Sequence, residues 1–474
     1  MTAPELIALI PLIILVGGAT GILLVAPFSG DDRTWPVGAG IITALAAALA
    51  AGLLEPPVTE VSRMFATHAL ARFFHILWIL AAAATLALSW RYLKRQGLLA
   101  GEFTALVLFA AAGLALLSSI TSLTGLFLAL QAFSLAFYVL IAFDRGSVRS
   151  AEAGLKYLVL GGVAAGLLAF AIALIYAASG TLHLPEALNG LSVGAALSPL
   201  ALAGWALLLA AIGFKLSLVP FHLWTPDVYQ GAPTPVTGLL ATGSKGAVVA
   251  ALLILMSALP AAPTALVPVL WVLAVLSMAV GTFAALVQEN VKRMLAYSSI
   301  THMGYILAAL LTWNATGQRA VLFYLVAYTV MTLGAFGSLA ALAGPGERQS
   351  LQDLRGLGRS HPLPAATLAV CLVALAGLPP TAGFTGKLAL FSGMFAGGYP
   401  WLALLGIFAS LFSVFFYLRP AISLFASDFA VDPGLSADAV PAGENAVLLL
   451  LLVLTFVLGL WPGPLFEFIA RITG

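Results

Sequence analysis

The sequence predicts an all-α integral membrane protein of about fourteen transmembrane helices. Of its 474 residues, 62% are hydrophobic and only 8% are charged, whereas soluble domains carry roughly 25% charged residues. Apolar runs of roughly 20 residues, the length needed to cross a bilayer as a helix, recur along the whole chain. The loops between them are short, so we expect a single membrane domain. The net charge of +2 gives no indication of nucleic-acid binding.

The apolar runs define the expected helices in order. We place them at residues 4–27, 34–54, 69–90, 99–118, 122–143, 154–178, 197–220, 235–258, 264–287, 294–312, 319–343, 363–395, 400–424 and 445–468. Only 179–196 and 425–444 are sizeable polar excursions. Residues 1–28 lack a basic region and a small-residue cleavage site, so we expect a retained first helix and not a signal peptide.

The basic residues indicate the orientation of the chain. Loops after odd-numbered spans hold twelve of them, namely Arg33, Arg91, Lys94, Arg95, Arg145, Arg149, Lys292, Arg293, Arg348, Arg355, Arg359 and Arg419. The opposite loops hold four, namely Arg63, Arg72, Arg319 and Arg471. The positive-inside rule then places the odd loops in the cytoplasm and both termini on the outer side.

Four lysines remain, and each lies within an apolar span: Lys156, Lys215, Lys245 and Lys387. A charge at the centre of a membrane helix costs at least about 2.5–3.5 kcal/mol, so these lysines predict a polar path inside the protein. Lysine suits a proton relay because desolvation favours its neutral form. The alternative is that a lysine extends to the interface and anchors its helix. That alternative weighs most for Lys156, near the start of its span.

Prolines interrupt two of the spans. Pro220 and Pro226 follow Lys215, and Pro379 and Pro380 precede Lys387. An internal proline removes a helical hydrogen bond, and the freed carbonyls need partners within the protein or water. Paired interruptions of this kind point to a transport site between inverted repeats. An ordinary packing kink is the alternative, and direct similarity between the two halves is weak.

Three sequence stretches carry a resemblance to a known family. Residues 214–229 read FKLSLVPFHLWTPDVY, and GAPTPVT follows at 231–237. The other stretches are NVKRMLAYSSI with HMGY at 290–305, and LPPTAGFTGK at 378–387. All three closely resemble the N subunit family of bacterial respiratory complex I, over residues from about 100 to 425. The wider class includes cation/proton antiporter subunits.

The resemblance implies a specific architecture and activity. It implies helices 1–3 over residues 1–98, two inverted five-helix repeats over 99–258 and 259–424, and a last loop and helix over 425–474. It implies a multi-pass protein of the bacterial inner membrane that translocates protons, driven by NADH–quinone electron transfer in partner subunits. Flavin, iron–sulfur clusters and quinone are expected in those partners, with no cofactor here. Neighbouring antiporter-like and small membrane subunits are the expected contacts.

The same resemblance assigns roles to individual residues. Lys215 and Lys387 match the proton-handling lysines of the two broken helices, Lys245 matches the connecting lysine, and Lys156 matches a further lysine. His222 and His302 match histidines that could bridge waters, although packing is an equal alternative for each. Pro220, Pro379 and Pro380 are expected to support the breaks.

Gln131 departs from the family pattern. The family usually places a glutamate there as the partner of the Lys215 equivalent, and a glutamine cannot hold a charge. No acidic residue falls in the middle of a predicted span. Three explanations stay open: another subunit supplies the carboxylate, water and Lys156 tune Lys215, or the site pumps differently.

Two alternative functions have to be weighed. One is a subunit of a multi-subunit sodium/proton antiporter, and the other is a subunit of a hydrogenase or ferredoxin-linked ion pump.

The single cysteine, Cys371, excludes a disulfide framework and a Cys-rich metal site. The chain has no phosphate loop, cofactor-binding glycine motif or metal-ligand cluster, so redox chemistry is expected in partner subunits.

Overall fold

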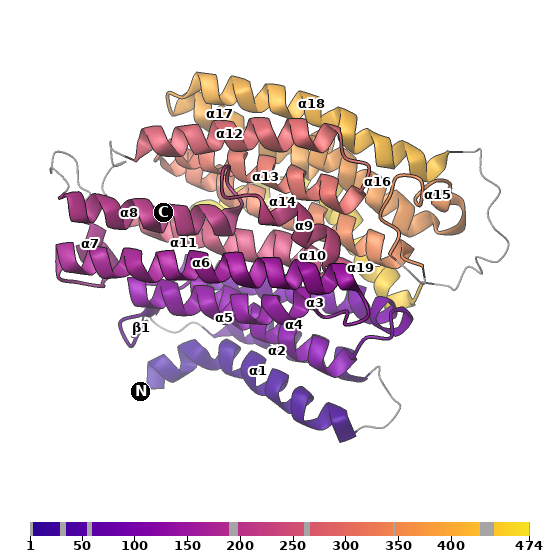
Figure 1. Cartoon of the computed structure of the whole chain (residues 1–474), viewed down its shortest axis with the longest axis horizontal. Helices are drawn as coiled ribbons and strands as arrows, with labels where there is room; N and C mark the ends of the chain where they lie inside the picture. Colours follow the sequence, from indigo (N-terminus) through magenta and orange to yellow (C-terminus); the bar gives the residue numbers. More distant parts are fainter. Residues whose placement is uncertain are drawn as a thin grey trace.

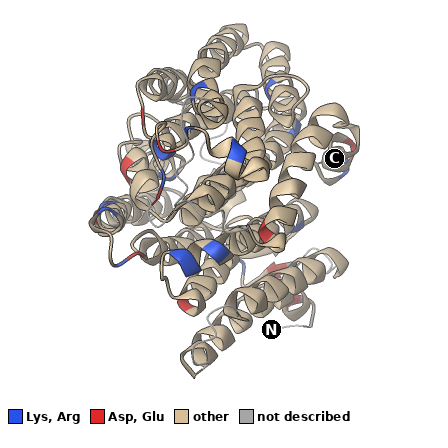
Figure 2. Cartoon of the chain, turned by 90° about the vertical axis from the view of Figure 1, so that its right-hand side faces the viewer, with Lys and Arg blue, Asp and Glu red and all other residues tan. Residues whose placement is uncertain are grey.

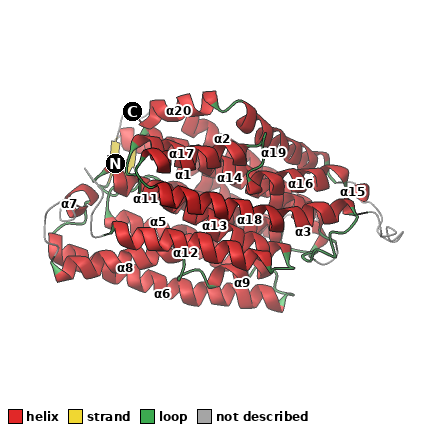
Figure 3. Cartoon of the chain, turned by 90° about the horizontal axis from the view of Figure 1, so that it is seen from above, coloured by secondary structure: helices red, strands yellow, loops and turns green. Residues whose placement is uncertain are grey.

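The apolar runs fold as long helices that lie side by side along the longest axis of the molecule (Figure 1). The computed structural model describes residues 3–28, 35–54, 59–188, 198–259, 266–344, 347–426 and 440–473. Figure 2 looks along the helices and shows that most of their length carries neither Lys, Arg, Asp nor Glu. Both termini lie at the same end of the bundle (Figures 1 and 3), as an even number of crossings requires.

The first part of the chain forms six long helices. They are α1 (Ala3–Val25), which continues into the short 3₁₀ helix η1 (Ala26–Phe28), α2 (Trp35–Leu53), α3 (Ala69–Arg95), α4 (Ala100–Leu117), α5 (Leu123–Ile141) and α6 (Val148–Ser179). Serine caps begin two of them, because the Ser122 and Ser147 side chains accept backbone N–H groups of the first turns of α5 and α6. A small hairpin of β1 (Thr59–Val61) and β2 (Phe65–Thr67) precedes α3, and the sequence analysis did not predict it.

The remaining helices alternate long and short pieces. They are α7 (Leu184–Leu188), α8 (Pro199–Leu216), α9 (Trp224–Gly231), α10 (Thr234–Leu239), the π-helical turn η3 (Leu240–Ser244), α11 (Lys245–Ser257), α12 (Val267–Leu286), α13 (Val291–Leu310), α14 (Ala315–Leu342), α15 (Leu357–Ser360), α16 (Pro362–Ala376), α17 (Ala382–Ala396), α18 (Pro400–Phe425), α19 (Ala442–Leu460) and α20 (Gly463–Thr473).

The helix inventory confirms the predicted fold class. Among the described residues, twelve helices are long and apolar enough to cross a membrane. Two further elements would bring this number to the expected fourteen. One is α13, whose first turn carries Lys292 and Arg293, and the other is α16 followed by α17 across a break. Helix α14 is central, with 89% of its most apolar stretch buried, whereas α6 is peripheral, with 28% buried.

Both predicted breaks are present, and they are alike. Helix α8 ends where Ser217 adopts a left-handed backbone, and α16 ends where Gly377 does. A cis proline follows in each case, at Pro220 and at Pro380. Helix α17 then begins in close contact with α16. The contact is so close that a Cβ atom added to Gly383 would lie 1.7 Å from the Ala374 carbonyl oxygen. Each break therefore consists of a left-handed residue at the end of a helix, followed three residues later by a cis proline.

Several predicted boundaries need correction. The last span, predicted at 445–468, begins earlier at Ala442 and is divided into α19 and α20 near Pro462, where proline interrupts helical hydrogen bonding. The polar excursion at 179–196 contains the short helix α7. Residues 189–196 of that excursion, residues 427–439 of the other and Arg33 lie outside the described residues.

Candidate functional site

Three of the four lysines singled out in the sequence are buried. Lys215 is 7% exposed, Lys245 0% and Lys387 3%. Lys215 stands in the last turn of α8, directly before the first break, and Lys387 stands in α17, shortly after the second. Lys245 opens α11, where the π-helical turn η3 ends. The helix irregularities of the fold thus coincide with the positions of buried ammonium groups.

Each buried lysine donates a hydrogen bond to a serine hydroxyl. The pairs are Lys215 with Ser134 at 2.7 Å, Lys245 with Ser299 at 2.7 Å and Lys387 with Ser410 at 2.8 Å. Lys387 also donates to the Ala376 carbonyl oxygen at 2.9 Å, which the second break has freed. No Asp or Glu among the described residues forms an ion pair with these three lysines.

Aromatic rings complete the surroundings of the buried lysines. The Lys245 nitrogen lies 5.3 Å from the centre of the Tyr229 ring, and the Lys387 nitrogen lies 5.4 Å from that of Tyr305. These separations are within the range at which a cation is attracted by the face of a ring. Hydroxyls and rings therefore take the place that carboxylates usually occupy around buried cations.

A series of hydroxyl groups leads away from Lys245. The Ser299 hydroxyl accepts from Lys245 and also from the Tyr328 hydroxyl at 2.9 Å, and the Tyr229 hydroxyl lies 3.4 Å from it. Hydroxyl groups both donate and accept, so such a series can pass a proton by exchanging hydrogen bonds. Ser299 contacts tyrosines from both α9 and α14 because its own helix, α13, packs against both of them.

His302 continues this series toward Lys387. It is one turn beyond Ser299 on α13 and 1% exposed. Its Nδ1 lies 2.5 Å from the Tyr324 hydroxyl, and its Nε2 lies 2.9 Å from the Tyr417 hydroxyl. The His302 ring packs 5.6 Å from the ring of Tyr305, which in turn faces Lys387. The His302 ring also lies 5.2 Å from that of Tyr328. Ring contacts therefore join the surroundings of Lys245 to those of Lys387, although no unbroken chain of hydrogen bonds connects the two lysines among the described residues.

A cavity reaches Lys387 from the surface of the chain. It measures about 730 Å³ and is bordered by residues of α16, α17 and α18, including Lys387 and Ser410. Its remaining walls are mostly apolar, among them Phe391 and Phe395. Water needs polar partners as well as room, so Lys387 and Ser410 are the places in this cavity that can hold it.

Lys156 differs from the other three lysines and corrects one expectation. Its side chain is 40% exposed in this chain, and its ammonium lies 2.7 Å from both Glu152 and Asp227. Asp227 also binds Arg293 at 2.6 Å. The expectation of four buried lysines without a carboxylate therefore fails for Lys156. Asp227 lies between the predicted spans at 197–220 and 235–258, and α9 brings it against α6 and α13.

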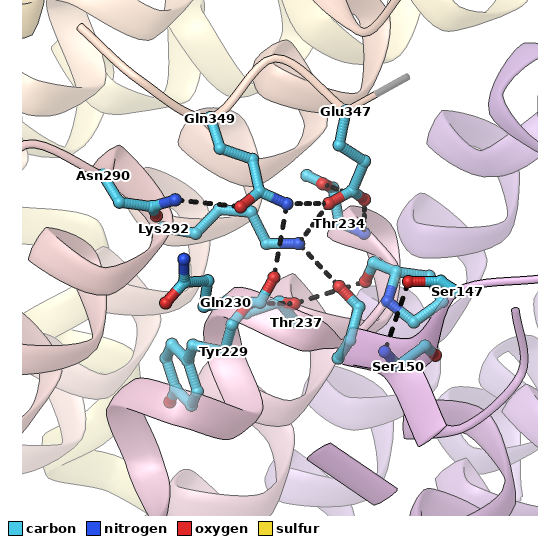
Figure 4. A network of polar contacts seen from close by, with 12 residues as sticks. Ser147, Ser150, Tyr229, Gln230, Thr234, Thr237, Asn290, Lys292, Glu347 and Gln349 are labelled. Atoms are coloured by element: carbon cyan, nitrogen blue, oxygen red, sulfur yellow. Dashed lines mark hydrogen bonds and ion pairs between the residues drawn. The ribbon is translucent and has the colours of Figure 1, made fainter. Parts of the chain in front are cut away.

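A buried lysine that the sequence analysis assigned to a loop is part of a larger polar network (Figure 4). Lys292 is 1% exposed and donates to the Glu347 carboxylate at 2.7 Å and to the Ala232 carbonyl oxygen at 2.6 Å. Tyr92 and Thr234 also donate to Glu347, at 2.5 and 2.7 Å. In the sequence Lys292 stands only two residues before the predicted span at 294–312, which is a weak indication of burial, and nothing identified Glu347 as its partner.

The network holds Glu347 in its charged form. Burial alone would raise the pKa of the Glu347 carboxyl, but the Lys292 ammonium and the hydrogen bonds from Tyr92 and Thr234 outweigh burial. The net effect holds the pKa of Glu347 below its ordinary value of 4.5. The charged pair therefore ties the segment after α14 to α3, α10 and α13.

The remaining candidate residues are only partly engaged. Gln131 is half-buried on α5, and no hydrogen bond joins it to Lys215 in the described structure. His222 is half-buried in the first break, and its buried Nδ1 has no hydrogen-bond partner among the described residues. Within the described residues, no group of three or more His, Cys, Asp or Glu side chains could hold a metal ion.

The fold and the buried lysines define an antiporter-like membrane protein, and comparisons place it more closely. A protein-family model described as "NADH:quinone oxidoreductase/Mrp antiporter, TM" matches residues 120–413. The "NADH-quinone oxidoreductase subunit N" of Geotalea uraniireducens (strain Rf4) is 45% identical over 473 residues, 100% of each chain. The chain belongs to the NADH-quinone oxidoreductase subunit N family.

Solved structures agree with this assignment. A chain of "Respiratory complex I from Thermus thermophilus with bound Aureothin" is 35% identical, with a TM-score of 0.81, covering 97% of this chain and 99% of that one. A chain of "Structure of Mrp complex from Dietzia sp. DQ12-45-1b" has a TM-score of 0.82 at 20% identity, covering 100% of this chain and 97% of that one. The latter likeness concerns the fold alone.

Proposed function

We propose that this chain is an antiporter-like membrane subunit of a complex I-type NADH:quinone oxidoreductase and that Lys215, Lys245 and Lys387 carry protons through it. The observation that carries the proposal is the burial of three ammonium groups, each held by a serine hydroxyl and joined in part by a hydroxyl and imidazole series. Purely structural lysines would be costly in such surroundings. Electron transfer takes place in partner subunits that hold the flavin, iron–sulfur clusters and quinone.

The contacts of each lysine support a proposed path. Lys215 exchanges protons at the first break, and Lys245 passes them through Ser299 and Tyr328 toward His302. His302 and its two tyrosines relay them toward Lys387. The cavity beside Lys387 provides access for water. His222 acts at the first break through water, because its buried Nδ1 has no hydrogen-bond partner among the described residues.

The arrangement of the chain in the membrane belongs to the same proposal. Residues 99–258 and 259–424 form two inverted repeats, which the matched breaks at Ser217 and Gly377 support. The termini, which share one end of the bundle, lie on the outer side of the bacterial inner membrane, while Lys292 and Glu347 lie at the cytoplasmic end. Cysteine-accessibility labelling at Thr2 and at Lys94 would test the orientation.

The test of the function is proton pumping by the whole complex. Lys215→Ala, Lys245→Ala and Lys387→Ala are introduced separately, and each complex is purified and reconstituted into vesicles. We expect NADH-driven acidification to fall by about tenfold or more while the complex remains assembled. Lys94→Ala is the matched control, because Lys94 is an exposed lysine at the end of α3. Normal pumping in all three buried-lysine variants would refute the proposal, as would a sodium-driven pH gradient that needs no NADH.

A further inference from the structure

Three aromatic rings surround the Lys215 ammonium group. Its nitrogen lies 5.4 Å from the ring centre of Tyr157, 5.5 Å from that of Phe133 and 5.8 Å from that of Phe214. These rings come from three different helices, α6, α5 and α8. They are buried, with Tyr157 and Phe133 both 0% exposed. Each of these distances is within the roughly 6 Å over which the face of an aromatic ring attracts a cation.

Trp224 holds two rings, Tyr157 and Phe214, of the aromatic cage that these two residues form with Phe133. The Tyr157 ring packs 4.8 Å from the ring of Trp224, and the Phe214 ring packs 5.4 Å from it. The Trp224 indole N–H donates to the Phe214 carbonyl oxygen at 2.9 Å, which fixes α9 against the end of α8. The rings therefore keep their orientation without help from the ammonium itself.

The polar surroundings of Lys215 are sparse. Its one hydrogen bond in the described structure goes to the Ser134 hydroxyl, and that hydroxyl also donates to the Leu130 carbonyl oxygen. The Ser134 oxygen is therefore left as an acceptor for the ammonium. Gln131 lies three residues earlier on α5, on a neighbouring part of the same helix face. It carries no charge and makes no hydrogen bond to Lys215 in the described structure.

We propose that the aromatic cage of Phe133, Tyr157 and Phe214, with the Ser134 hydroxyl, stabilises the protonated form of Lys215 in place of a carboxylate. This inference rests on the proposed function, in which Lys215 carries protons. A cage differs from an ion pair in one respect that matters here: among the described residues no carboxylate pairs with Lys215 to take its proton, and the Tyr157 hydroxyl of the cage makes no hydrogen bond to it. Lys215 therefore exchanges its proton with water or with a hydroxyl.

The decisive experiment replaces Phe133 by phenylalanines carrying one, two and three fluorine atoms. Fluorine withdraws charge from the face of the ring while the shape of the side chain hardly changes. We expect the alkaline limb of the pH profile of NADH-driven pumping to move to lower pH with each added fluorine. A series with an unchanged pH profile would overturn the cage, because packing is conserved throughout the series.

Ordinary substitutions provide a second, independent readout. Phe133→Leu is expected to lower pumping at pH 8 by about threefold or more, and adding Gln131→Glu should restore at least half of the loss. A carboxylate can replace the missing stabilisation of charge but cannot repair packing. Phe127→Leu is the matched control, because Phe127 is a partly buried phenylalanine on α5 outside the cage, and it should pump normally.

Comparing Lys215→Ala with the Phe133 variants distinguishes a failure of the cage from a failure of the proposed function. Lys215→Ala is measured in the same vesicles. If Lys215→Ala pumps normally, the role of Lys215 itself fails, and the cage fails with it. If Lys215→Ala abolishes pumping while the fluorinated series and Phe133→Leu leave the pH profile unchanged, only the cage fails. Loss of pumping in Phe133→Leu that Gln131→Glu does not relieve also counts against the cage.

Discussion

The Lys292 ammonium lies 2.7 Å from the Glu347 carboxylate, and the lysine is 1% exposed. Removing one partner of a buried ion pair leaves the other charge uncompensated, which typically costs about 3–5 kcal/mol. We therefore expect Lys292→Met to lower the thermal stability of the purified complex strongly. The double variant with Glu347→Met should be more stable than Lys292→Met alone. Equal stability of the single and double variants would show that the pair is not coupled.

The pH dependence of the same pair has a definite sign. The folded-state pKa of Glu347 is held below its ordinary value of 4.5. A group with a lowered folded-state pKa stabilises the protein above its unfolded value, and the contribution is lost as the pH falls through the folded value. The difference in melting temperature between the wild-type chain and Glu347→Gln should therefore be largest near neutral pH and shrink below about pH 4.5. A constant difference over that interval would contradict the assignment.

Asp227 binds two cations from two different helices, yet its stabilising effect should be modest. Its side chain is 34% exposed, and Lys156 and Arg293 are 40% and 30% exposed. Partly exposed pairs contribute roughly 0–1 kcal/mol each because water screens them. Asp227→Asn should therefore leave assembly intact and lower the melting temperature only slightly. Glu152→Gln is the control, since it leaves Lys156 bound to Asp227. A loss of several kcal/mol would show that the pair is fully desolvated.

Gln131→Glu should be tolerated in an otherwise wild-type chain. The new carboxylate would stand near Ser134, which already contacts Lys215 at 2.7 Å, so the ammonium can compensate the added charge. Quinone reduction and proton pumping should stay within about twofold of wild type. The matched control is Gln131→Met, which changes the same position without adding a charge. A complex that fails only with Gln131→Glu would show that the site requires a neutral partner.

The fold was largely predictable from the sequence because a bilayer imposes strong constraints. Spans of sufficient length and apolarity can only be helices there, and prolines at 220, 379 and 380 marked both breaks. The buried lysines were identified for the same reason, since few charges enter such spans. The pairing of distant residues left no comparable signal in the sequence. Glu347 stands in a loop 55 residues from Lys292, and Asp227 stands 71 residues from Lys156, between two predicted spans. The rings around Lys215 were hidden among many aromatic residues.

The imidazole of His302 is the position at which the proposed path between Lys245 and Lys387 can be interrupted most cleanly. Tyr417 and Tyr324 contact its two ring nitrogens. Tyr417→Phe removes one contact and keeps the ring, and a buried polar atom without a partner costs about 1–3 kcal/mol. If the Tyr417 hydroxyl relays protons, coupled quinone reduction should fall by about tenfold, with a changed solvent isotope effect in D₂O.

A matched control separates this relay from packing. Tyr297→Phe alters a half-buried tyrosine on α13 whose hydroxyl makes no hydrogen bond in the described structure. It should leave both the rate and the isotope effect unchanged. If Tyr417→Phe lowers stability but leaves the rate and isotope effect at wild-type values, the hydroxyl only supports His302. The proton would then have to reach Lys387 through water in the cavity bordered by Ser410, where Ser410→Ala becomes the variant that slows pumping.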